Sequence, residues 1–503
     1  MKRRDFIRTG GAALAGIALL PQIGCTPMSN VPADVAAMLA HFGVTENDLR
    51  KVIAVALEKG GDYADLFFEH TLDNTVALQD GAVNRAGSDI QYGVGIRVVA
   101  GEQTGYAYVE NISLNEMINA ARTASRIASG SAKTPPVKVD VQTFKNYYPV
   151  INSWEDADIQ AKMPYLQKLN DRIFALDPRV IKVNATINDS TSYILYYNSE
   201  GLIRHDCRPM ALVAGICIMQ DGDRIENSQT VRSARMDFSF LKDEMIEEMA
   251  QEVVKDTSIL FDAVKPKGGE MPVVMAAGDS GVLLHEAIGH AFEADFNRKN
   301  VSIFSDKLNQ KICDEHISVA DDGTVEGDRG SINFDDEGVD SQKTYIVKDG
   351  VLNSYLHDRI SASYYGVAPT GNGRRESFKF IPIPRMRVTY MENGNCSEAD
   401  IIASVKKGVY VNKFTNGQVQ IGAGDFTFFV KSGYLIENGK LTQPIKDINI
   451  IGNGPKALAD ITMVGNNLKI EQFGGTCGKD GQGVPVGLGL PSVLVKQLTV
   501  GGE

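Results

Sequence analysis

Residues 285–290 read His285-Glu286-Ala287-Ile288-Gly289-His290, and this stretch restricts the structure more than any other part of the 503-residue chain. Two imidazoles that flank a carboxylate are the arrangement with which proteins bind zinc and activate water. Histidines four residues apart lie about 40° apart on a helix, but a spacing of five splays them by about 140°. One metal ion can be shared only if the helix widens into a π-type turn, which Gly289 makes easier. Apolar flanks at 282–284 and 291–292 indicate that this helix is buried.

A tetrahedral catalytic zinc ion takes three protein ligands and leaves one position open for water, so a third ligand is required. The candidates are Glu293, Asp295, His316, His357 and the cysteines. Glu293, three residues past His290, suits a group that supports a ligand. Cys477 is favoured because it lies in the glycine-rich segment 473–487, where the backbone can approach a ligand closely. The alternative is that Cys477 is an inert, small hydrophobic residue in a turn.

The residues of this motif also suggest a reaction. A zinc ion lowers the pKa of a bound water molecule toward about 7 and polarises a carbonyl group. Glu286 could take the proton from water and pass it to a leaving amine, which is hydrolysis of an acyl group without a covalent intermediate. Arg374 and Arg375 could anchor a substrate carboxylate or an oxyanion, or they could belong to a solvated, glycine-rich turn.

The segment 283–298 resembles the metal-site helix of the TldD/PmbA family of metalloproteases, whose signature is HExxxH. Further segments, mostly in the C-terminal half, resemble the TldD branch of that family in the same order. They are 369–377, 382–386, 434–439, 463–466 and the Cys477 loop. The N-terminal half resembles the family only loosely, through residues 61–69.

This resemblance implies specific roles for four residues. Members of the TldD branch bind one zinc ion through both histidines of the motif and a late cysteine, here His285, His290 and Cys477. The glutamate of the motif, here Glu286, is the general base. The PmbA (TldE) branch lacks the metal site. The resemblance therefore implies that this chain is the catalytic partner of a heterodimer with a related TldE/PmbA-like subunit, and that its substrates are unfolded or extended peptides.

The first 25 residues have the layout of an export signal. Twin arginines, Arg3 and Arg4, precede Phe6, and a mostly apolar run follows over 10–24, which is too short to span a bilayer. This pattern resembles a twin-arginine (Tat) signal. Cys25 follows Ile23-Gly24, so it could be acylated and tether the protein to a membrane. We therefore expect an exported protein, either in the periplasm or anchored to the membrane as a lipoprotein.

Composition narrows the class of protein further. A formal net charge of −12 and a pI near 5.2 argue against a nucleic-acid-binding surface. Six cysteines without a CxxC spacing do not form a disulfide scaffold. The length suits two domains after the signal at 1–25.

The hydrophobic pattern predicts an α+β protein. In the N-terminal domain, 31–265, we expect a helix over 31–59, strands over 62–110 with a hairpin turn at Asp80-Gly81, and long strands over 180–236. Helices are expected at 114–129, 163–176 and 240–261, and the break at 265–269 marks the domain boundary. The C-terminal domain, 266–503, is expected to be β-rich, a barrel or sandwich that carries the metal-site helix.

Two functions remain open from the sequence. The first is a zinc peptidase in which Glu286 is the general base, and which binds peptides by pairing their backbone with a strand edge. The second is an exported, non-catalytic binding or scaffold protein with a structural zinc ion. The polar, turn-rich segment 302–336 is either the wall or lid of a substrate chamber or a surface excursion.

Overall fold

The fold is taken from a computed structural model, which describes residues 34–136, 138–420, 422–472 and 474–502. The predicted export signal at 1–25, with Cys25 at its end, lies outside the described residues. Among the residues that are described, no helix combines the length and the apolar character needed to cross a bilayer.

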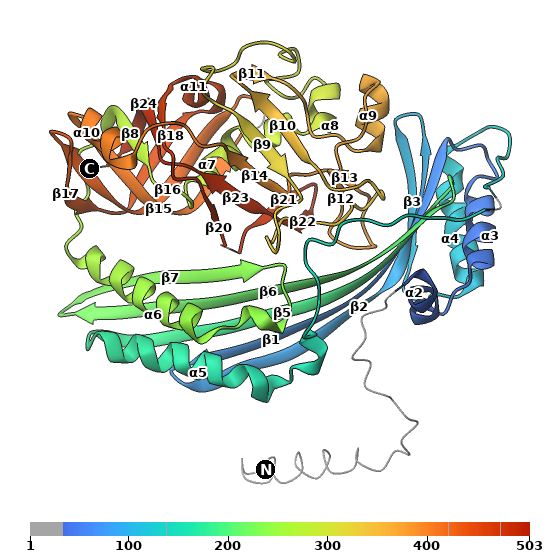
Figure 1. Ribbon diagram of the computed structural model, residues 1–503, viewed down its shortest axis with the longest axis horizontal. Helices are drawn as coiled ribbons and strands as arrows, with labels where there is room; N and C mark the ends of the chain where they lie inside the picture. The colour runs from blue at the N-terminus through green and yellow to red at the C-terminus, as the bar shows by residue number, and fades with distance from the viewer. Residues whose placement is uncertain (1–33, 137, 421, 473, 503) are drawn as a thin grey trace, which may run out of the picture.

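A curved antiparallel sheet dominates the N-terminal half and lies below the C-terminal half in Figure 1. Its strands follow the order β3, β2, β1, β5, β6, with β7 and the short β4 both paired to β6. Their bounds are β1 Tyr63–Gln79, β2 Ala82–Ala100, β3 Gln103–Val109, β4 Asp140–Val141, β5 Val180–Asn198, β6 Leu202–Asp221 and β7 Arg224–Ala234. The strands predicted over 62–110 and 180–236 are thus present.

The predicted hairpin turn joins β1 to β2. Asp80 and Gly81 have positive φ values of 52° and 79°, which the two central residues of a type I′ turn require. The strands then pair from Gln79 with Ala82 to Tyr63 with Val99.

Five helices cover one face of this sheet, and the opposite face is turned toward the C-terminal domain (Figure 1). They are α2 Val35–Phe42, α3 Glu46–Ala56, α4 Leu114–Ala124, α5 Ile159–Leu176 and α6 Asp243–Ser258. Side chains alternate along each strand. On β1, Leu66 and Phe68 therefore pack against the helices, whereas Glu69 and Thr71 line a cavity on the other face.

The single helix predicted over 31–59 is wrong, because the chain forms two helices there. Gly43 caps α2 in the left-handed conformation, with φ of 65°, and turns the chain. Thr45 and Asp48 then form a capping box that starts α3.

The C-terminal half is β-rich, and of the two predicted architectures, barrel and sandwich, it contains the barrel. β15, β8, β24, β18 and β16 pair in this order, and pairing of β15 with β16 closes the ring. The bounds are β8 Gly269–Met275, β15 Lys407–Val419, β16 Asp425–Glu437, β18 Ile448–Asn453 and β24 Val493–Gly501, with β17 Lys440–Ile445 and β19 Ile461–Val464 attached.

A second sheet packs beside the barrel, in the order β11, β10, β9, β14, β23, β20. Its strands are β9 Val319–Asp322, β10 Lys343–Lys348, β11 Val351–Leu352, β14 Val388–Met391, β20 Lys469–Glu471 and β23 Gly487–Leu490. Two small two-stranded sheets are β12 Gly373–Arg374 with β13 Ile383–Pro384, and β21 Thr476–Lys479 with β22 Gln482–Pro485. The α-helices of this half are short: α7 Gly281–Leu284, α8 Ala294–Arg298, α9 Arg359–Tyr365, α10 Glu398–Ser404 and α11 Gly454–Ala459.

The segment 302–336 has two parts: residues 306–316 are mostly exposed, as in a surface excursion, whereas residues 327–336 lie between the two halves. The backbone N–H of Asn333 donates to the hydroxyl of Tyr148 at 2.8 Å, and that hydroxyl donates to Asp206 at 2.7 Å. Arg329 and Ile332 line the cavity under the large sheet. Residues 327–336 therefore form part of the wall of this cavity.

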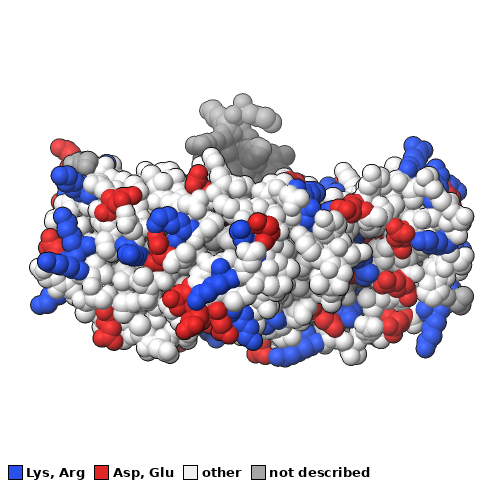
Figure 2. Space-filling model, turned by 90° about the horizontal axis from the view of Figure 1, so that it is seen from above, with Lys and Arg blue, Asp and Glu red and all other residues white. Residues whose placement is uncertain are grey.

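The face drawn in Figure 2 carries acidic and basic side chains side by side. The charges are mixed over the whole face, and no large area has a single sign. This face therefore offers no extended basic track of the kind that nucleic-acid backbones bind.

Candidate metal centre

The helix that carries the HExxxH motif changes its winding inside the motif. α7 ends at Leu284, residues His285–Gly289 form a π-helical turn, η6, and His290–Phe292 form a 3₁₀ turn, η7. The backbone N–H of His290 donates to the carbonyl of His285, which is the i→i+5 bond expected from the spacing. The π turn predicted from the sequence is present, and it brings both imidazoles to one side.

Gly289 was predicted to make the π turn easier through its backbone freedom, but the structure gives it a different role. Its φ of −57° and ψ of −51° are ordinary helical values, so the backbone does not use glycine's extra freedom. A Cβ atom at this position would instead lie 2.3 Å from Sδ of Met386. Glycine is needed because the chain packs directly against a buried methionine.

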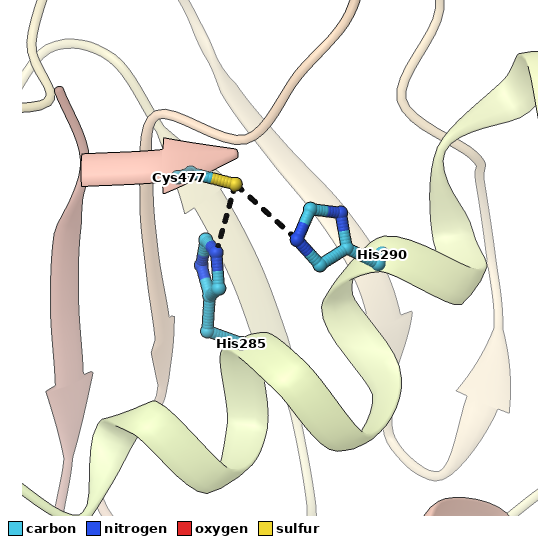
Figure 3. Close-up of side chains that lie close together, drawn as sticks. All are labelled: His285, His290 and Cys477. Atoms are coloured by element: carbon cyan, nitrogen blue, oxygen red, sulfur yellow. Dashed lines mark hydrogen bonds between the residues drawn. The ribbon is translucent and has the colours of Figure 1, made fainter. Parts of the chain in front are cut away.

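Three side chains meet at the centre of the site, as Figure 3 shows. Nε2 of His285 lies 3.1 Å from Sγ of Cys477, and Nε2 of His290 lies 3.3 Å from the same sulfur. All three residues are buried, and their three ligand-type atoms lie within 4.8 Å of one another. Among the described residues, this is the one group of three or more potential ligands that gathers so tightly.

Cys477 is held in a form suited to metal binding. Burial opposes ionisation of the thiol, but the imidazoles of His285 and His290 outweigh this effect and lower its pKa to about 4. The guanidinium of Arg385 donates hydrogen bonds to the backbone carbonyl of Cys477 and, at 3.3 Å, to that of Gln482. Arg385 thereby fixes the β21–β22 hairpin beneath the sulfur.

Glu293 supports His290 and does not join the three central atoms. Its Oε2 lies 3.0 Å from Nδ1 of His290 and accepts a bond of 3.0 Å from Nζ of Lys479. A bond from Nδ1–H leaves the lone pair on Nε2 directed at the centre. Burial would raise the pKa of Glu293, but the ammonium of Lys479 and the imidazole of His290 lower it to about 2.

The other residues considered as third ligands lie elsewhere. Asp295 accepts a bond of 2.7 Å from Lys479. His316 is exposed and pairs with Asp314, and His357 is buried beside the rings of Tyr355 and Tyr365. Cys477 is therefore the candidate that the structure brings to both histidines.

Glu286 faces a cleft and not the hydrophobic core. The cleft has a volume of about 430 Å³ and lies between the N-terminal sheet and the barrel. Residues 227–232 of β7 form one side, and Lys413 and Phe414 of β15 are on the other. Half-buried Glu286 can therefore reach both the cleft and the neighbourhood of the histidine that precedes it.

Arg374 and Arg375 are buried, which excludes the predicted alternative that they belong to a solvated turn. Arg374 donates to the carbonyls of Met386 and Pro485 at 2.6 and 2.8 Å, and Arg375 donates to the carbonyl of Asp336 at 2.8 Å. Both line a cavity of about 630 Å³ beneath the large sheet, not the cleft that holds Glu286. A role in binding substrate stays a prediction.

Comparison with known sequences identifies the family. Profiles of the PmbA/TldA metallopeptidases match residues 64–128 with domain 1, 152–261 with the central domain and 268–502 with the C-terminal domain. The chain belongs to the TldD/PmbA family of metallopeptidases.

Individual relatives of the TldD/PmbA family align over most of the chain. The Metalloprotease TldD homolog of Buchnera aphidicola is 37% identical over 450 residues, which are 88% of this chain and 93% of that protein. The Zinc metalloprotease TldD homolog of Saccharolobus solfataricus is 28% identical over 458 residues, 90% of this chain and 99% of that protein. The solved structure of TldE from Thermococcus kodakarensis shares the fold, with a TM-score of 0.72 at 18% sequence identity. The match covers 90% of this chain and 100% of that one.

The residues of this TldD/PmbA chain fit a zinc ion. In a tetrahedral site, Zn–N bonds of about 2.0–2.1 Å and a Zn–S bond of about 2.3 Å separate nitrogen from sulfur by about 3.6 Å. The observed separations of 3.1 and 3.3 Å differ from this by a few tenths of an ångström. Two imidazoles and a thiolate leave one tetrahedral position open, as a hydrolytic site requires.

Two residues that support this centre were not assigned a role from the sequence. Arg385 holds the hairpin, and Lys479 neutralises Glu293. Lys479 could have been found, because it stands two residues after Cys477 on a strand and so shares its face. Arg385 reaches Cys477 only through tertiary folding.

Proposed function

We propose that this chain is a zinc-dependent peptidase of the catalytic TldD branch. The observation that carries the proposal is the convergence of His285, His290 and Cys477, with Glu286 next to the first ligand and lining a cleft. Membership of the TldD/PmbA family and the printed name of the Saccharolobus relative support both the class and the metal. One zinc ion per chain would be held by the three residues.

Zinc bound at these three residues would make a water molecule acidic and would polarise the scissile carbonyl. Glu286 accepts the proton of the attacking water and delivers it to the leaving amine. Glu293 holds the proton on Nδ1 of His290, so that Nε2 stays directed at the site. Arg385 and Lys479 keep the hairpin and the carboxylate in place around the reacting groups.

The walls of the cleft suit an extended peptide. Among the described residues, β7 pairs with no strand other than β6, and its other edge carries no strand, although its end is held by the bond from the N–H of Ser233 to the carbonyl of Gln472. β8 pairs with β15 only at residues 409–411, which leaves the following part of β15 without a partner on that side. A peptide backbone can add to such an edge as a further strand, with little dependence on its sequence.

The competing function is a structural zinc ion in a non-catalytic protein. A carboxylate in a cleft beside the ligands has no purpose in that case, which favours the peptidase. The test is Glu286→Gln, with Glu248→Gln, a change on the outer part of α6, as the matched control. We expect Glu286→Gln to keep its zinc and melting temperature and to lose peptide hydrolysis, whereas loss of zinc and stability would favour the structural role.

The partner that we propose is a related, metal-free TldE/PmbA-like subunit. The shared fold with TldE supports two subunits of the same architecture. Light scattering of the two co-expressed chains should give the mass of a heterodimer. Two separate monomers in that experiment would refute the proposed pair.

We also propose that the chain is exported, to the periplasm or to a membrane surface through acylated Cys25. The motifs at residues 1–25 support this. Fractionation of cells that express the full chain should find it outside the cytoplasm, and Arg3→Lys/Arg4→Lys should retain it inside. Cys25→Ser should release it from the membrane fraction, and if it does not, the lipid tether is wrong.

A further inference from the structure

A second cavity, distinct from the cleft at Glu286, is lined by several arginines and by acidic residues. It has a volume of about 630 Å³ and lies between the polar face of the large sheet and the C-terminal domain. Six arginines line it: Arg85 is exposed, and Arg208, Arg235, Arg329, Arg374 and Arg375 are buried or half-buried. They come from both halves of the chain, so the fold collects them from distant parts of the sequence.

Two of these arginines have carboxylate partners. Arg208 donates to Asp206 at 2.9 Å and to Asp336 at 2.7 Å. Arg375 lies 3.7 Å from Asp65. Their charges are therefore compensated within the protein.

The other three buried or half-buried arginines have no carboxylate at salt-bridge distance among the described residues, and neutral oxygens are their hydrogen-bond partners. Arg374 donates to two backbone carbonyls. Arg329 donates to the carbonyl of Gly475 at 3.1 Å and to Oγ1 of Thr476 at 3.4 Å. Arg235 is only 4% exposed, yet it donates solely to the carbonyl of Arg329, at 3.4 Å, and its Nε has no partner.

The acidic residues that line the cavity, Glu69, Asp73, Asp189, Asp336 and Glu376, form no salt bridge with these three arginines among the described residues. Asp328 accepts a hydrogen bond from the backbone of Gly330 at 2.8 Å and not from a guanidinium. Asp189, in the same cavity, is paired with Lys162 at 2.6 Å. Burial and the charge of Arg235 together lower the pKa of Arg329 to about 10 and that of Arg374 to about 9, although Asp328 opposes this for Arg329 and Asp336 for Arg374. Buried positive charge of this kind is stabilised by an anion that enters the cavity.

We propose that Arg235, Arg329 and Arg374 form a binding site for a carboxylate of the substrate peptide. A planar carboxylate can accept two bonds from one guanidinium, and several N–H groups of the three arginines remain free to donate them. The carboxylate belongs either to an acidic side chain or to the C-terminus of the peptide.

The position of this site connects it with the metal centre. Thr476, which Arg329 contacts, precedes Cys477 on β21, and Pro485, which Arg374 contacts, is the cross-strand partner of Thr476. Successive side chains on a strand point to opposite faces, so the side chain of Thr476, which Arg329 contacts, lies on the face opposite the sulfur of Cys477. Arg374 contacts the backbone of the neighbouring strand at Pro485. A role of these arginines in substrate specificity rests on the proposed peptidase function. Binding of a carboxylate can be measured without turnover.

The experiment measures peptide binding by calorimetry to the zinc-loaded full chain with Glu286→Gln, which prevents turnover. Three hexapeptides are compared: a neutral one with a C-terminal amide, the same peptide with a free C-terminal carboxylate, and the amide with one central Gln replaced by Glu. We expect at least one of the two anionic peptides to bind ten-fold more tightly than the neutral one, and its identity reveals the source of the carboxylate. Equal affinity of all three peptides, or no binding, would overturn the proposal.

Variants locate the site. Arg235→Gln and Arg329→Gln should each reduce the preference for the anionic peptide at least five-fold, with circular dichroism to confirm folding. Arg85→Gln is the matched control, because Arg85 lines the same cavity but is exposed. An equal loss in Arg85→Gln would show a general effect of charge and refute the site. If Arg235→Gln does not fold, the comparison of the three peptides on the parent protein still decides.

Failure of this proposal can be told apart from failure of the peptidase function. Equal affinity for the neutral and anionic peptides, together with hydrolysis of both by the parent chain, would refute the arginine site and keep the peptidase. Binding of the anionic peptide through Arg235, without hydrolysis of any peptide, would keep the carboxylate site and refute the peptidase.

Discussion

Gly289→Ala tests how the π turn is held. The backbone angles at this position suit alanine, and helix propensity favours alanine over glycine by about 1 kcal/mol. The new Cβ, however, would lie 2.3 Å from Sδ and 3.2 Å from Cε of Met386, which is fully buried. Overpacking of this kind costs about 1–3 kcal/mol. The difference is a net loss of up to about 2 kcal/mol in the free energy of unfolding, and we expect a loss of about 1 kcal/mol.

The same substitution should weaken metal binding, because the π turn η6 carries His285 and sets the position of His290, which follows it. A loss of about 1.4 kcal/mol corresponds to a ten-fold weaker zinc affinity, measured by competition with a chromophoric chelator. Gly87→Ala is the matched control, since a Cβ there meets nothing within 4 Å. Combining Gly289→Ala with Met386→Ala should restore part of the loss in a double-mutant cycle. Unchanged stability and zinc affinity in Gly289→Ala would refute the reasoning.

Two further predictions concern buried charge. Lys479→Met leaves Glu293 and Asp295 without their shared ammonium. We therefore expect the free energy of unfolding, measured with denaturant, to fall by about 3–5 kcal/mol. A fall of less than about 1 kcal/mol would contradict this role of Lys479. Burial raises the pKa of Glu69 from 4.5 to about 7, so the folded chain binds this proton more tightly than the unfolded chain does, and stability falls as pH rises between these values. Glu69→Gln should therefore stabilise the protein at pH 8, by up to about 3 kcal/mol, and have little effect at pH 4. A gain that does not depend on pH would rule out this explanation.

Local patterns in the sequence predict much of the fold. The alternation along β1 and β2 and the Asp80-Gly81 turn predict the hairpin, and glycine-rich β segments predict a barrel or a sandwich, of which the barrel is present. The broken N-terminal helix was missed, because Gly43 interrupts an otherwise helical pattern. Closure of the barrel by β15 and β16 depends on strand pairing that a single sequence does not reveal.

The metal site and the arginines near it could also be predicted only in part. The spacing of His285 and His290 alone requires a π turn, whereas the choice of Cys477 rested on the resemblance to a family as well as on its loop. The burial of Arg374 could not be predicted, because the carbonyls that it contacts belong to Met386 and Pro485. Nothing in the local sequence distinguishes such an arginine from one in a solvated turn.

The most direct test of the metal centre is elemental analysis of the purified chain and three variants. We predict about one zinc ion per chain in the parent protein, lost in His290→Ala and Cys477→Ser. It should be kept in Cys313→Ser, the matched change at another buried free cysteine. Zinc retained in Cys477→Ser, or no metal in the parent protein, would contradict the site described here.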